Sequence, residues 1–270
     1  MTSLRIGCVK YLNAHPLLRG WPGDVELDHP AALCQRLANG ELDIALVSSF
    51  EFLRNPIYQI VDDVSISSDG SVYSVVVAHR GRISDVEEIE LDPASQTAVN
   101  LLRCLLAELR LNPRLVQNGA RVSPAVGKLA SGSRAQLLIG DQAIRFRQNQ
   151  ATEVQFWDLG EQWKRLTGFP FVYALWLIRP EVVDAKQIAN RLRALRDENF
   201  TDLEGLIAKL IAGVPGPDHP KLDQQFLFRY YRENLLFSFG EKEKEGLRTF
   251  AKLCAKHGFF SKRDFVFSLV

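Results

Sequence analysis

The stretch SVYSVVVAHR occupies residues 71–80, and a second run, FPFVYALWLI, occupies residues 169–178. Both runs are rich in valine or aromatic side chains, which is typical of buried β-strands. Between them lies a segment of roughly 90 residues with its own strand and helix patterns, which is enough for a small domain. If that segment is inserted into a second domain, the chain crosses twice between two lobes. A ligand would then bind in the cleft between the lobes.

The rest of the chain alternates short strands with helices up to about residue 178. Outside the two long runs, the pattern predicts a strand at 4–9, a helix at 30–39 that ends at Gly40, a strand and then a helix within 43–52, a helix at 96–109, and a strand and then a helix within 135–144. From Pro180 onward the pattern is helical, with a proline and glycine loop at 213–220. This order predicts an α/β fold with parallel strands and a helical C-terminal region.

The charges of the chain nearly cancel. The 270 residues include 33 Lys and Arg against 32 Asp and Glu, for a formal net charge of +1. No overall basic field is therefore expected to attract nucleic acid or an anionic membrane surface. No apolar run is long enough to span a bilayer and no secretory signal is visible, so we expect a cytoplasmic protein. The sequence does not indicate an oligomeric state.

Cysteine and histidine spacing argues against a metal or redox centre. The four cysteines lie beside apolar residues and none forms a C-x-x-C pair, so they are predicted to be reduced thiols in the core. The five histidines are scattered, with no H-x-x-x-H pair. We therefore expect no metal site.

Small polar residues recur where a predicted strand gives way to a helix. Four such junctions are present: Asn13 to Pro16, Ser48 with Ser49, Ser95 to Thr97, and Gly140 to Gln142. In α/β sheets ligands bind at the carboxyl ends of the strands, and each helix N-terminus offers unpaired N–H groups and a partial positive charge. With Ser, Thr and Asn side chains added, such junctions suit a carboxylate or a phosphate.

Each junction also has a purely structural interpretation. Ser, Thr, Asn and Asp are the preferred N-caps of helices, and Ser48-x-x-Glu51 fits a capping box. Asp141 would repel an anion, so capping is its better interpretation. The chain has no glycine-rich phosphate loop, which disfavours nucleotides. Convergence of several junctions on one cleft would favour binding, and a sequence alone does not show convergence.

The sequence contains no recognisable catalytic motif. There is no G-x-S-x-G elbow and no H-E-x-x-H pattern. His15 is the one histidine beside a candidate junction, and it is either a base or hydrogen-bond donor of the site or a structural side chain. Aromatic residues around the second long run indicate core packing by default, although some of the rings also suit a pocket wall. These residues are Trp163, Phe169, Phe171, Tyr173 and Trp176.

Seven motifs follow one another along nearly the whole chain. They are RIGCVKYLNAHPL (5–17), GELDIALVSSFEF (40–52), GSVYSVVV (70–77), DPASQTAVNLLRCLL (92–106), LLIGDQAI (137–144), DLGEQWKRLTGFPFVYALWLIRP (158–180) and YYRENLLFSFGEKEKEGLRTFAKL (230–253). In this order they resemble the chorismate dehydratases of the futalosine route to menaquinone. No single motif decides the resemblance, but the series does.

The resemblance implies a fold like that of type II periplasmic binding proteins, with two α/β lobes, two crossover strands and a central cleft. We expect one lobe at 1–78 plus 176–270 and the inserted lobe at 79–175. The implied reaction removes water from chorismate, a small dicarboxylate, and leaves 3-[(1-carboxyvinyl)oxy]benzoate. Ring aromatisation supplies the driving force, and the enolpyruvyl carboxylate of the substrate can act as the base. The resemblance implies neither a metal nor an organic cofactor.

The resemblance also assigns site residues. It implies catalytic polar groups at Asn13 and Ser74, and substrate-binding groups at Ser48, Ser49, Ser95 and Thr97. Two hydroxyls usual in the family are absent, because Ala14 follows Asn13 and Ala98 follows Thr97, and His79 stands where another polar residue is common. We expect His15 to join the binding residues as a compensation for Ala14.

Two other functions compete with the dehydratase hypothesis. One is a non-catalytic binding protein for a small carboxylate on the same fold. The other is the sister enzyme of the pathway, which acts on a cyclised dehypoxanthine futalosine. That family opens with an S-P-D-T-like motif, which this sequence lacks.

Overall fold

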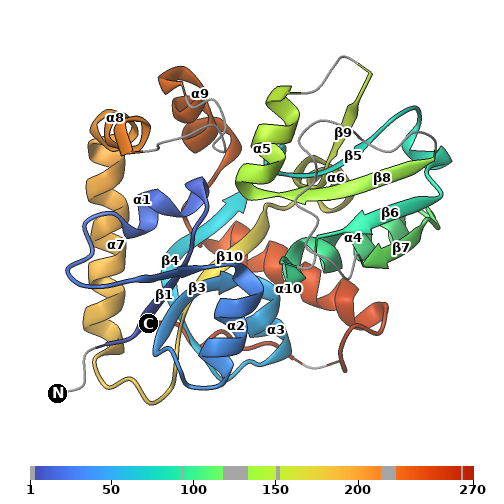
Figure 1. Cartoon of the computed structure of the whole chain (residues 1–270). Coiled ribbons are helices and arrows are strands. Elements are labelled where there is room, and N and C mark those ends of the chain that lie inside the picture. Colours follow the sequence, from blue (N-terminus) through green and yellow to red (C-terminus); the bar gives the residue numbers. More distant parts are fainter. Residues whose placement is uncertain (1–3, 93, 118–132, 150–152, 214–222, 263) are drawn as a thin grey trace.

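The computed structural model describes residues 4–92, 94–117, 133–149, 153–213, 223–262 and 264–270 of the chain. Within these residues, two five-stranded sheets lie side by side, and helices pack on their faces (Figure 1).

The first sheet has the strand order β2-β1-β3-β10-β4. Its strands are β1 (Ile6–Val9), β2 (Glu26–Asp28), β3 (Ile44–Ser48), β4 (Gln59–Ser68) and β10 (Phe171–Ile178). β1 is parallel to β2 and β3, whereas β10 is antiparallel to β3 and β4. The expectation of parallel strands is therefore wrong for β10. The start of β10 pairs with the ends of β3 and β4, so the returning chain must run in the opposite direction.

The second sheet has the strand order β7-β6-β8-β5-β9. Its strands are β5 (Val75–His79), β6 (Glu88–Leu91), β7 (Arg114–Gln117), β8 (Arg134–Ile139) and β9 (Gln155–Asp158). β6 is parallel to β7 and β8, whereas β5 is antiparallel to β8 and β9, so the expectation of parallel strands is wrong for β5 as well. The chain enters this sheet between β4 and β5 and leaves it between β9 and β10. The predicted lobe boundaries at 78/79 and 175/176 stay a prediction; both fall inside a strand that belongs to a single sheet.

The predicted helices at 30–39 and 96–109 begin and end close to the observed bounds, and those expected within 43–52 and 135–144 follow their strands, whereas the helix at 159–167 was not predicted. The helices are α1 (His15–Leu18), α2 (Pro30–Ala38), α3 (Ser49–Arg54), α4 (Gln96–Glu108), α5 (Gly140–Asn149), α6 (Leu159–Thr167), α7 (Ala185–Thr201), α8 (Leu203–Gly213), α9 (Gln224–Arg229) and α10 (Glu241–Lys256). Short 3₁₀ turns cover Leu12–Ala14 and Ile83–Asp85, and a π-helical turn covers Tyr230–Asn234. From residue 214 on, the loop predicted at 213–220 lies outside the described residues. No helix in the described ranges has the length and hydropathy to cross a membrane.

The structure departs from the predicted strand at 71–80, because β5 starts only at Val75. Tyr73 has a φ of 66°, and the N–H of Ser74 donates to the carbonyl of Val72 at 2.8 Å, so residues 72–74 form a tight γ-turn. The Asp158 carboxylate accepts hydrogen bonds from the N–H groups of Val72 and Tyr73 at 3.1 and 2.9 Å. This buried carboxylate therefore holds the backbone just before Ser74 in a conformation that is rare for a residue with a side chain.

Apolar side chains from both sheets form one continuous core cluster. A smaller cluster lies between the second sheet and α5 and consists of Val76, Ala78, Leu138, Ala143, Phe146 and Val154. The closing helix α10 packs on β10 of the first sheet and on α4 beside the second sheet (Figure 1). At its end, Lys256 and His257 contact the Glu108 carboxylate at 2.6 and 2.7 Å. All four cysteines are buried and free of disulfide bonds, as predicted for core thiols.

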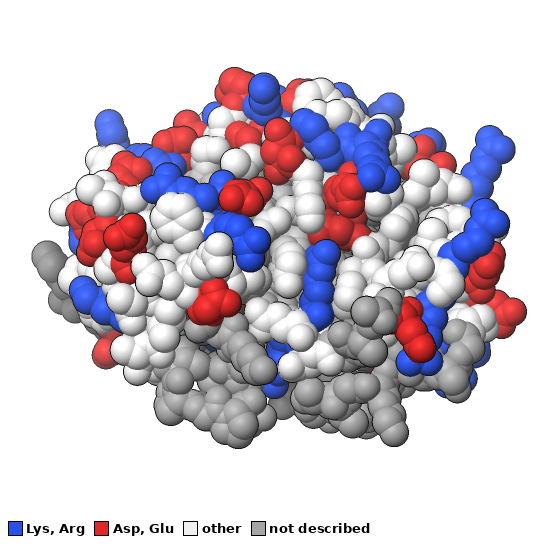
Figure 2. Space-filling view, turned by 90° about the horizontal axis from the view of Figure 1, so that it is seen from above, with Lys and Arg blue, Asp and Glu red and all other residues white. Residues whose placement is uncertain are grey.

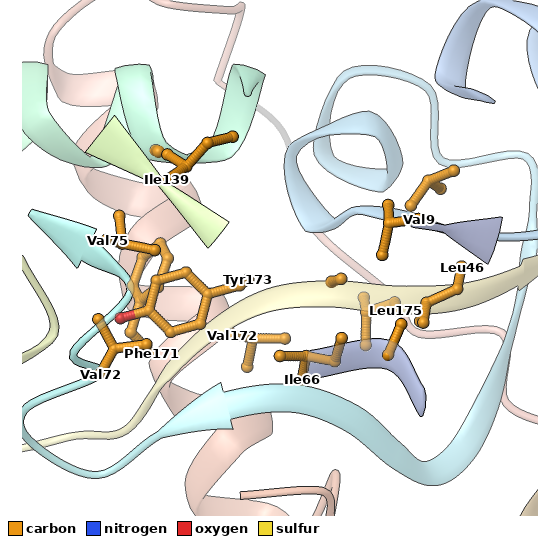
Figure 3. Close-up of a cluster of buried hydrophobic side chains, with 14 of the residues drawn as sticks. Val9, Leu46, Ile66, Val72, Val75, Ile139, Phe171, Val172, Tyr173 and Leu175 are labelled. Carbon is orange, nitrogen blue, oxygen red and sulfur yellow. The ribbon is translucent and has the colours of Figure 1, made fainter. Parts of the chain in front are cut away.

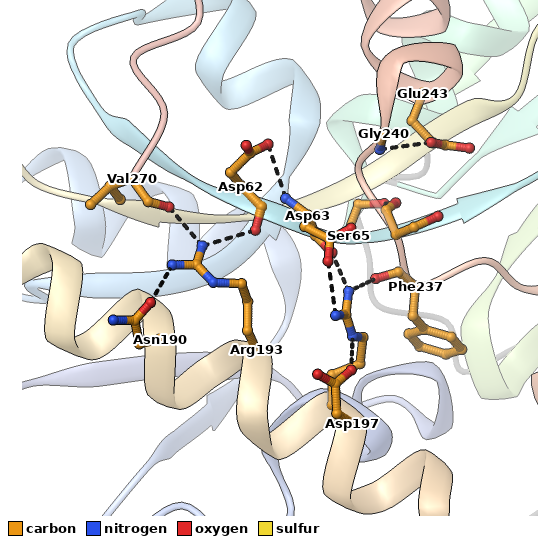
Figure 4. Close-up of polar contacts among 12 residues, drawn as sticks. Asp62, Asp63, Ser65, Asn190, Arg193, Asp197, Phe237, Gly240, Glu243 and Val270 are labelled. Atoms are coloured by element: carbon orange, nitrogen blue, oxygen red, sulfur yellow. Dashed lines mark hydrogen bonds and ion pairs between the residues drawn. The ribbon is translucent and has the colours of Figure 1, made fainter.

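Helix α7 fixes the chain's last residue against β4. Arg193 donates to the carbonyls of Asp62 and Val270 at 3.1 and 2.9 Å, and to the Asn190 side chain at 2.7 Å (Figure 4). Because one guanidinium bridges all three groups, α7, β4 and the C-terminal tail are joined on the side of the first sheet.

Candidate functional site

The four strand-to-helix junctions contribute lining residues to one pocket between the two sheets. The lining residues are Val9, Tyr11, Asn13, Pro30, Ser48, Ile66, Val72, Ser74, Val75, Ser95, Thr97, Ala98, Ile139, Gly140, Tyr173 and Ala174. The convergence that the sequence could not show is therefore present, and it favours a binding site over four unrelated helix caps.

The apolar part of the pocket comes from both sheets. Figure 3 shows Val75 and Ile139 of the second sheet on one side of the Tyr173 ring and Val9 of the first sheet on the other. The valine, isoleucine and aromatic surfaces keep the local dielectric low, which strengthens every hydrogen bond formed inside the pocket.

Ser48 and Thr97 join the two sides of the pocket through a hydrogen bond between their hydroxyls. The predicted capping box is wrong, because the Ser48 side chain makes no cap hydrogen bond to α3 and Glu51 pairs instead with Arg54 at 2.5 Å. Thr97 also accepts the N–H of Phe50 at 3.2 Å, which supplies one of the α3 amides with a partner from α4. The structural interpretation that explained Ser48 from sequence therefore does not hold.

Some of the serine and threonine O–H groups in the pocket remain available as hydrogen-bond donors. The bond between Ser48 and Thr97 uses one of their two O–H groups and leaves the other to donate elsewhere. Ser95 is the N-cap of α4, and its oxygen accepts the Ala98 N–H at 3.1 Å, so its own O–H is not used in that bond. These donors lie at the positive end of the α4 dipole, which suits an anion.

Asn13 contributes a polar atom with no partner. Its side-chain oxygen is buried and makes no hydrogen bond in the described structure. Both backbone polar groups of the preceding residue, Leu12, are paired. Its N–H donates to Asp141 at 2.9 Å, and its carbonyl accepts the Tyr231 hydroxyl at 2.8 Å. A buried unpaired carbonyl oxygen is costly, and a ligand that donates a hydrogen bond would relieve that cost.

Ser74 reaches the pocket from the turn that precedes β5. Its carbonyl accepts the N–H of Gly140, the first residue of α5, at 2.8 Å. Gly140 has a φ of +55°, and a Cβ there would lie 2.9 Å from the Tyr11 ring. Glycine is therefore required at this position both for the backbone conformation and for the close approach of Tyr11.

Tyr11 and Tyr173 are the titratable side chains among the lining residues. Burial is the largest cause that raises the pKa of each phenol, so both stay neutral near pH 7. Ser68 donates to the Gly70 carbonyl at 3.0 Å, so the Tyr173 O–H donates to Ser68, 3.1 Å away, and its oxygen remains an acceptor. The described lining thus includes no Lys, Arg, His, Asp or Glu.

Charge outside the pocket does not single out an anion site either. On the face shown in Figure 2, Lys and Arg side chains are interspersed with Asp and Glu side chains. In the described ranges, no group of three His, Cys, Asp or Glu side chains is placed to hold a metal ion. Recognition of a ligand therefore depends on the local hydroxyls, amides and helix ends of the pocket.

Two of the predicted site residues do not line the pocket. Ser49 is fully buried, and its hydroxyl donates to the Val172 carbonyl at 2.7 Å. His15 is half-buried at the start of α1, and burial, with a smaller effect of Arg19, lowers its pKa and favours the neutral ring. The structure brings the other five together: Asn13, Ser48, Ser74, Ser95 and Thr97.

Asp141 also differs from its predicted role as a helix cap. Its carboxylate accepts the Leu12 N–H across the gap between the sheets, and burial raises its pKa to about 6. The two alanines that replace hydroxyl residues usual in the resembling family also differ in position. Ala98 lines the pocket, whereas Ala14 is buried outside the lining.

Sequence reasoning missed the residues that hold the site from a distance. Asp158 fixes the turn before Ser74, and the Tyr230 hydroxyl donates to the Ser74 oxygen at 2.8 Å. Tyr11 could have been suspected from its place beside Asn13. No local signal identifies Asp158 or Tyr230, because their partners lie about 85 and 156 residues away.

Solved structures with a similar backbone show the fold. A protein of Archaeoglobus fulgidus superposes with a TM-score of 0.70 and 17% identity, covering 95% of this chain and 98% of that one. The alkanesulfonate-binding protein of Xanthomonas axonopodis, bound to MOPS, gives a TM-score of 0.66 and 15% identity, covering 96% of this chain and 94% of its own. The predicted fold of the periplasmic-binding-protein kind is confirmed.

The sequence comparisons go further than the fold. A chorismate dehydratase of Thermus thermophilus is 32% identical over 267 residues, which cover 92% of this chain and 93% of that protein. A family model described as menaquinone biosynthesis matches residues 4–256, a range that includes every residue lining the pocket. With both agreements extending across the two sheets and the site between them, the chain belongs to the menaquinone biosynthesis family.

Proposed function

We propose that this chain is a chorismate dehydratase, a hydro-lyase that converts chorismate into 3-[(1-carboxyvinyl)oxy]benzoate and water. The Thermus thermophilus relative carries that name. The observation that carries the proposal is the convergence of neutral hydroxyl donors and helix N-termini on one largely apolar pocket. Such a pocket suits a small, ring-shaped substrate with two carboxylates and one hydroxyl.

The donors of the pocket fall into two groups that match the two carboxylates. Ser95 and the Ser48–Thr97 pair surround the N-terminus of α4 and would hold one carboxylate through charge-assisted hydrogen bonds. Ser74 lies beside the N-terminus of α5, on the other sheet. Neutral donors bind the anions without placing a cation next to the reacting ring.

The reaction requires removal of the hydrogen on the ether-bearing ring carbon and departure of the neighbouring hydroxyl group. The C–H electrons form the new ring double bond, the C–O bond breaks, and the departing oxygen takes a proton to leave as water. The described pocket lining offers no ionised or ionisable base near pH 7. In this mechanism the enolpyruvyl carboxylate of the substrate takes the proton and returns it to the leaving oxygen.

The protein then contributes position and charge stabilisation. The unpartnered oxygen of Asn13 accepts the hydrogen of the ring hydroxyl and fixes the direction in which that group leaves. The Ser74 hydroxyl donates to the same oxygen as negative charge develops on it. Both side chains belong to segments whose backbones are held by long-range hydrogen bonds, so little reorganisation is needed during the reaction.

Incubation of the purified chain with chorismate tests the proposal directly. Product is followed by its aromatic absorbance and identified by mass spectrometry, with and without EDTA. We expect release of the enolpyruvyl benzoate in both samples. Chorismate that remains intact at high enzyme concentration excludes the dehydratase. Calorimetric binding of chorismate without product would instead support the alternative of a small-carboxylate binding protein.

A further inference from the structure

The hydroxyl of Ser74 receives a hydrogen bond from a residue that does not line the pocket. Tyr230 donates to the Ser74 oxygen at 2.8 Å, and only 1% of the Tyr230 surface is exposed. Tyr230 opens the π-helical turn Tyr230–Asn234, and its ring stacks on Phe226 with 5.8 Å between centroids and a 9° interplanar angle.

The backbone of Ser74 is already fixed when Tyr230 makes this contact. The Ser74 N–H donates to Val72 and its carbonyl accepts from Gly140, both at 2.8 Å. Because Tyr230 also holds the Ser74 Oγ, the freedom that remains is rotation of the hydroxyl hydrogen around the Cβ–Oγ bond. That hydrogen cannot point at Tyr230, whose own hydrogen occupies that side of the oxygen. The Val72 carbonyl, at 3.5 Å, is a poor acceptor, which leaves the direction of the pocket.

We propose that Tyr230 is a positioning residue that directs the Ser74 hydroxyl hydrogen into the pocket, toward the oxygen that leaves the substrate. The inference rests on the proposed function. Burial raises the pKa of Tyr230 further above its usual value, so the phenol remains a donor over the pH range of ordinary assays. Its neighbours secure the same turn, since Tyr231 donates to Leu12 at 2.8 Å and Asn234 donates to Ser71 at 3.1 Å.

A double-mutant cycle separates positioning from a general structural role. The variants are Tyr230→Phe, Ser74→Ala and the double variant, with Tyr58→Phe as the control. Tyr58 is fully buried, its hydroxyl accepts from Asn55 at 3.3 Å, and it does not line the pocket. The control therefore removes a buried phenol oxygen of the same kind, away from the site.

With chorismate as substrate, we expect Tyr230→Phe to lower kcat about tenfold with KM unchanged within about twofold. Ser74→Ala should lower kcat about 100-fold, as loss of a donor to developing charge does. In the Ser74→Ala background, Tyr230→Phe should have an effect below about twofold, because the hydroxyl that it directs is gone. Tyr58→Phe should leave kcat unchanged within about twofold.

A tenfold effect of Tyr230→Phe that persists in the Ser74→Ala background overturns the inference, and so does an unchanged kcat of the single variant. If the unaltered chain binds chorismate without turnover, the proposed function fails separately. The same variants are then compared by their Kd for chorismate, measured by calorimetry. Coupling in that Kd supports the contact between Tyr230 and Ser74 as a determinant of binding, and its absence overturns it. A chain that neither binds nor converts chorismate overturns both proposals.

Discussion

Ser48 and Thr97 are 49 residues apart in the sequence, yet their hydroxyls share a hydrogen bond at the pocket. The next serine in the chain, Ser49, is fully buried and donates to the Val172 carbonyl at 2.7 Å, while its oxygen lies at the longer distance of 3.5 Å from the Thr97 oxygen. Two adjacent serines thus have different surroundings: one lines the pocket and the other supports the core. This difference separates substrate binding from stability in a single pair of substitutions.

We expect Ser48→Ala to raise KM for chorismate about tenfold, because a donor to the carboxylate is lost. Ser49→Ala should leave KM unchanged but lower the free energy of unfolding by about 1–2 kcal/mol, since the buried Val172 carbonyl loses its partner. Steady-state kinetics and urea unfolding of both variants check this. A KM effect of equal size in the two variants would contradict the assignment.

Asn13→Ala should abolish most turnover without loosening the fold. The Asn13 side-chain oxygen has no hydrogen-bond partner in the described structure, so loss of that oxygen leaves no protein donor unpaired. We expect kcat/KM to fall about 100-fold or more and the midpoint of thermal unfolding to stay within about 2 °C. Activity close to that of the unaltered chain would exclude Asn13 from the catalytic step.

Asp141→Asn should stabilise the chain in a pH-dependent manner. Burial raises the pKa of Asp141 from 3.8 to about 6, so between these values the folded chain binds more protons than the unfolded chain. Its contribution to stability therefore declines as pH rises from about 4 to about 6, and the full cost of the buried charge persists above that window. Asparagine keeps an oxygen that can accept the Leu12 N–H but carries no charge.

Urea unfolding at two pH values measures this cost. At pH 8 we expect Asp141→Asn to be more stable than the unaltered chain by about 1–3 kcal/mol. At pH 4 most of that difference should disappear, because both side chains are then largely uncharged. A difference of constant size at both pH values would show that the titration of Asp141 is not its cause.

Gly140→Ala and Gly168→Ala form a matched pair for the contact with Tyr11. Both glycines have positive φ, +55° and +77°, but an added Cβ meets the Tyr11 ring at 2.9 Å only at Gly140, and nothing lies within 4 Å at Gly168. Gly168→Ala should therefore lower the free energy of unfolding only by the backbone strain, about 1 kcal/mol, and leave activity unchanged.

Gly140→Ala should lower the free energy of unfolding by more than Gly168→Ala does. It should also reduce kcat/KM at least tenfold, because Tyr11 must move out of the pocket lining. Unfolding and kinetic measurements on both variants give the comparison. Equal losses of stability, with activity retained in both, would show that Tyr11 adjusts freely.

Local sequence signals predicted the elements that carry the site. The strand and helix boundaries at β3–α3, α4 and β8–α5 follow from apolar runs that end in small polar residues, and these rules act within a few positions. β4 was not among the predicted strands, because Asp62 and Asp63 interrupt its apolar pattern. It is completed by β10 and by the C-terminal tail, which lie far away in the sequence.

The errors at the site have the same non-local origin. Ser48 and Glu51 satisfy the spacing of a capping box. In the structure, however, the Ser48 hydroxyl bonds to Thr97, and the Glu51 carboxylate pairs with Arg54. The apolar pattern at 71–74 continues that of β5, but the Asp158 carboxylate, a long way down the chain, bends this segment into a turn. Contacts of this kind depend on the assembled sheets and leave no periodic signal in the sequence.

The interrupted first sheet has a consequence for how the chain is made. Every described strand of the second sheet lies between residues 75 and 158, so these strands are all present once this stretch has been synthesised. β3 and β4 do not pair with each other in the sheet, because β10, at 171–178, lies between them. Both therefore lack this neighbour until β10 has been synthesised. During synthesis the inner segment is therefore expected to fold first, while the N-terminal strands stay open and exposed to chaperones.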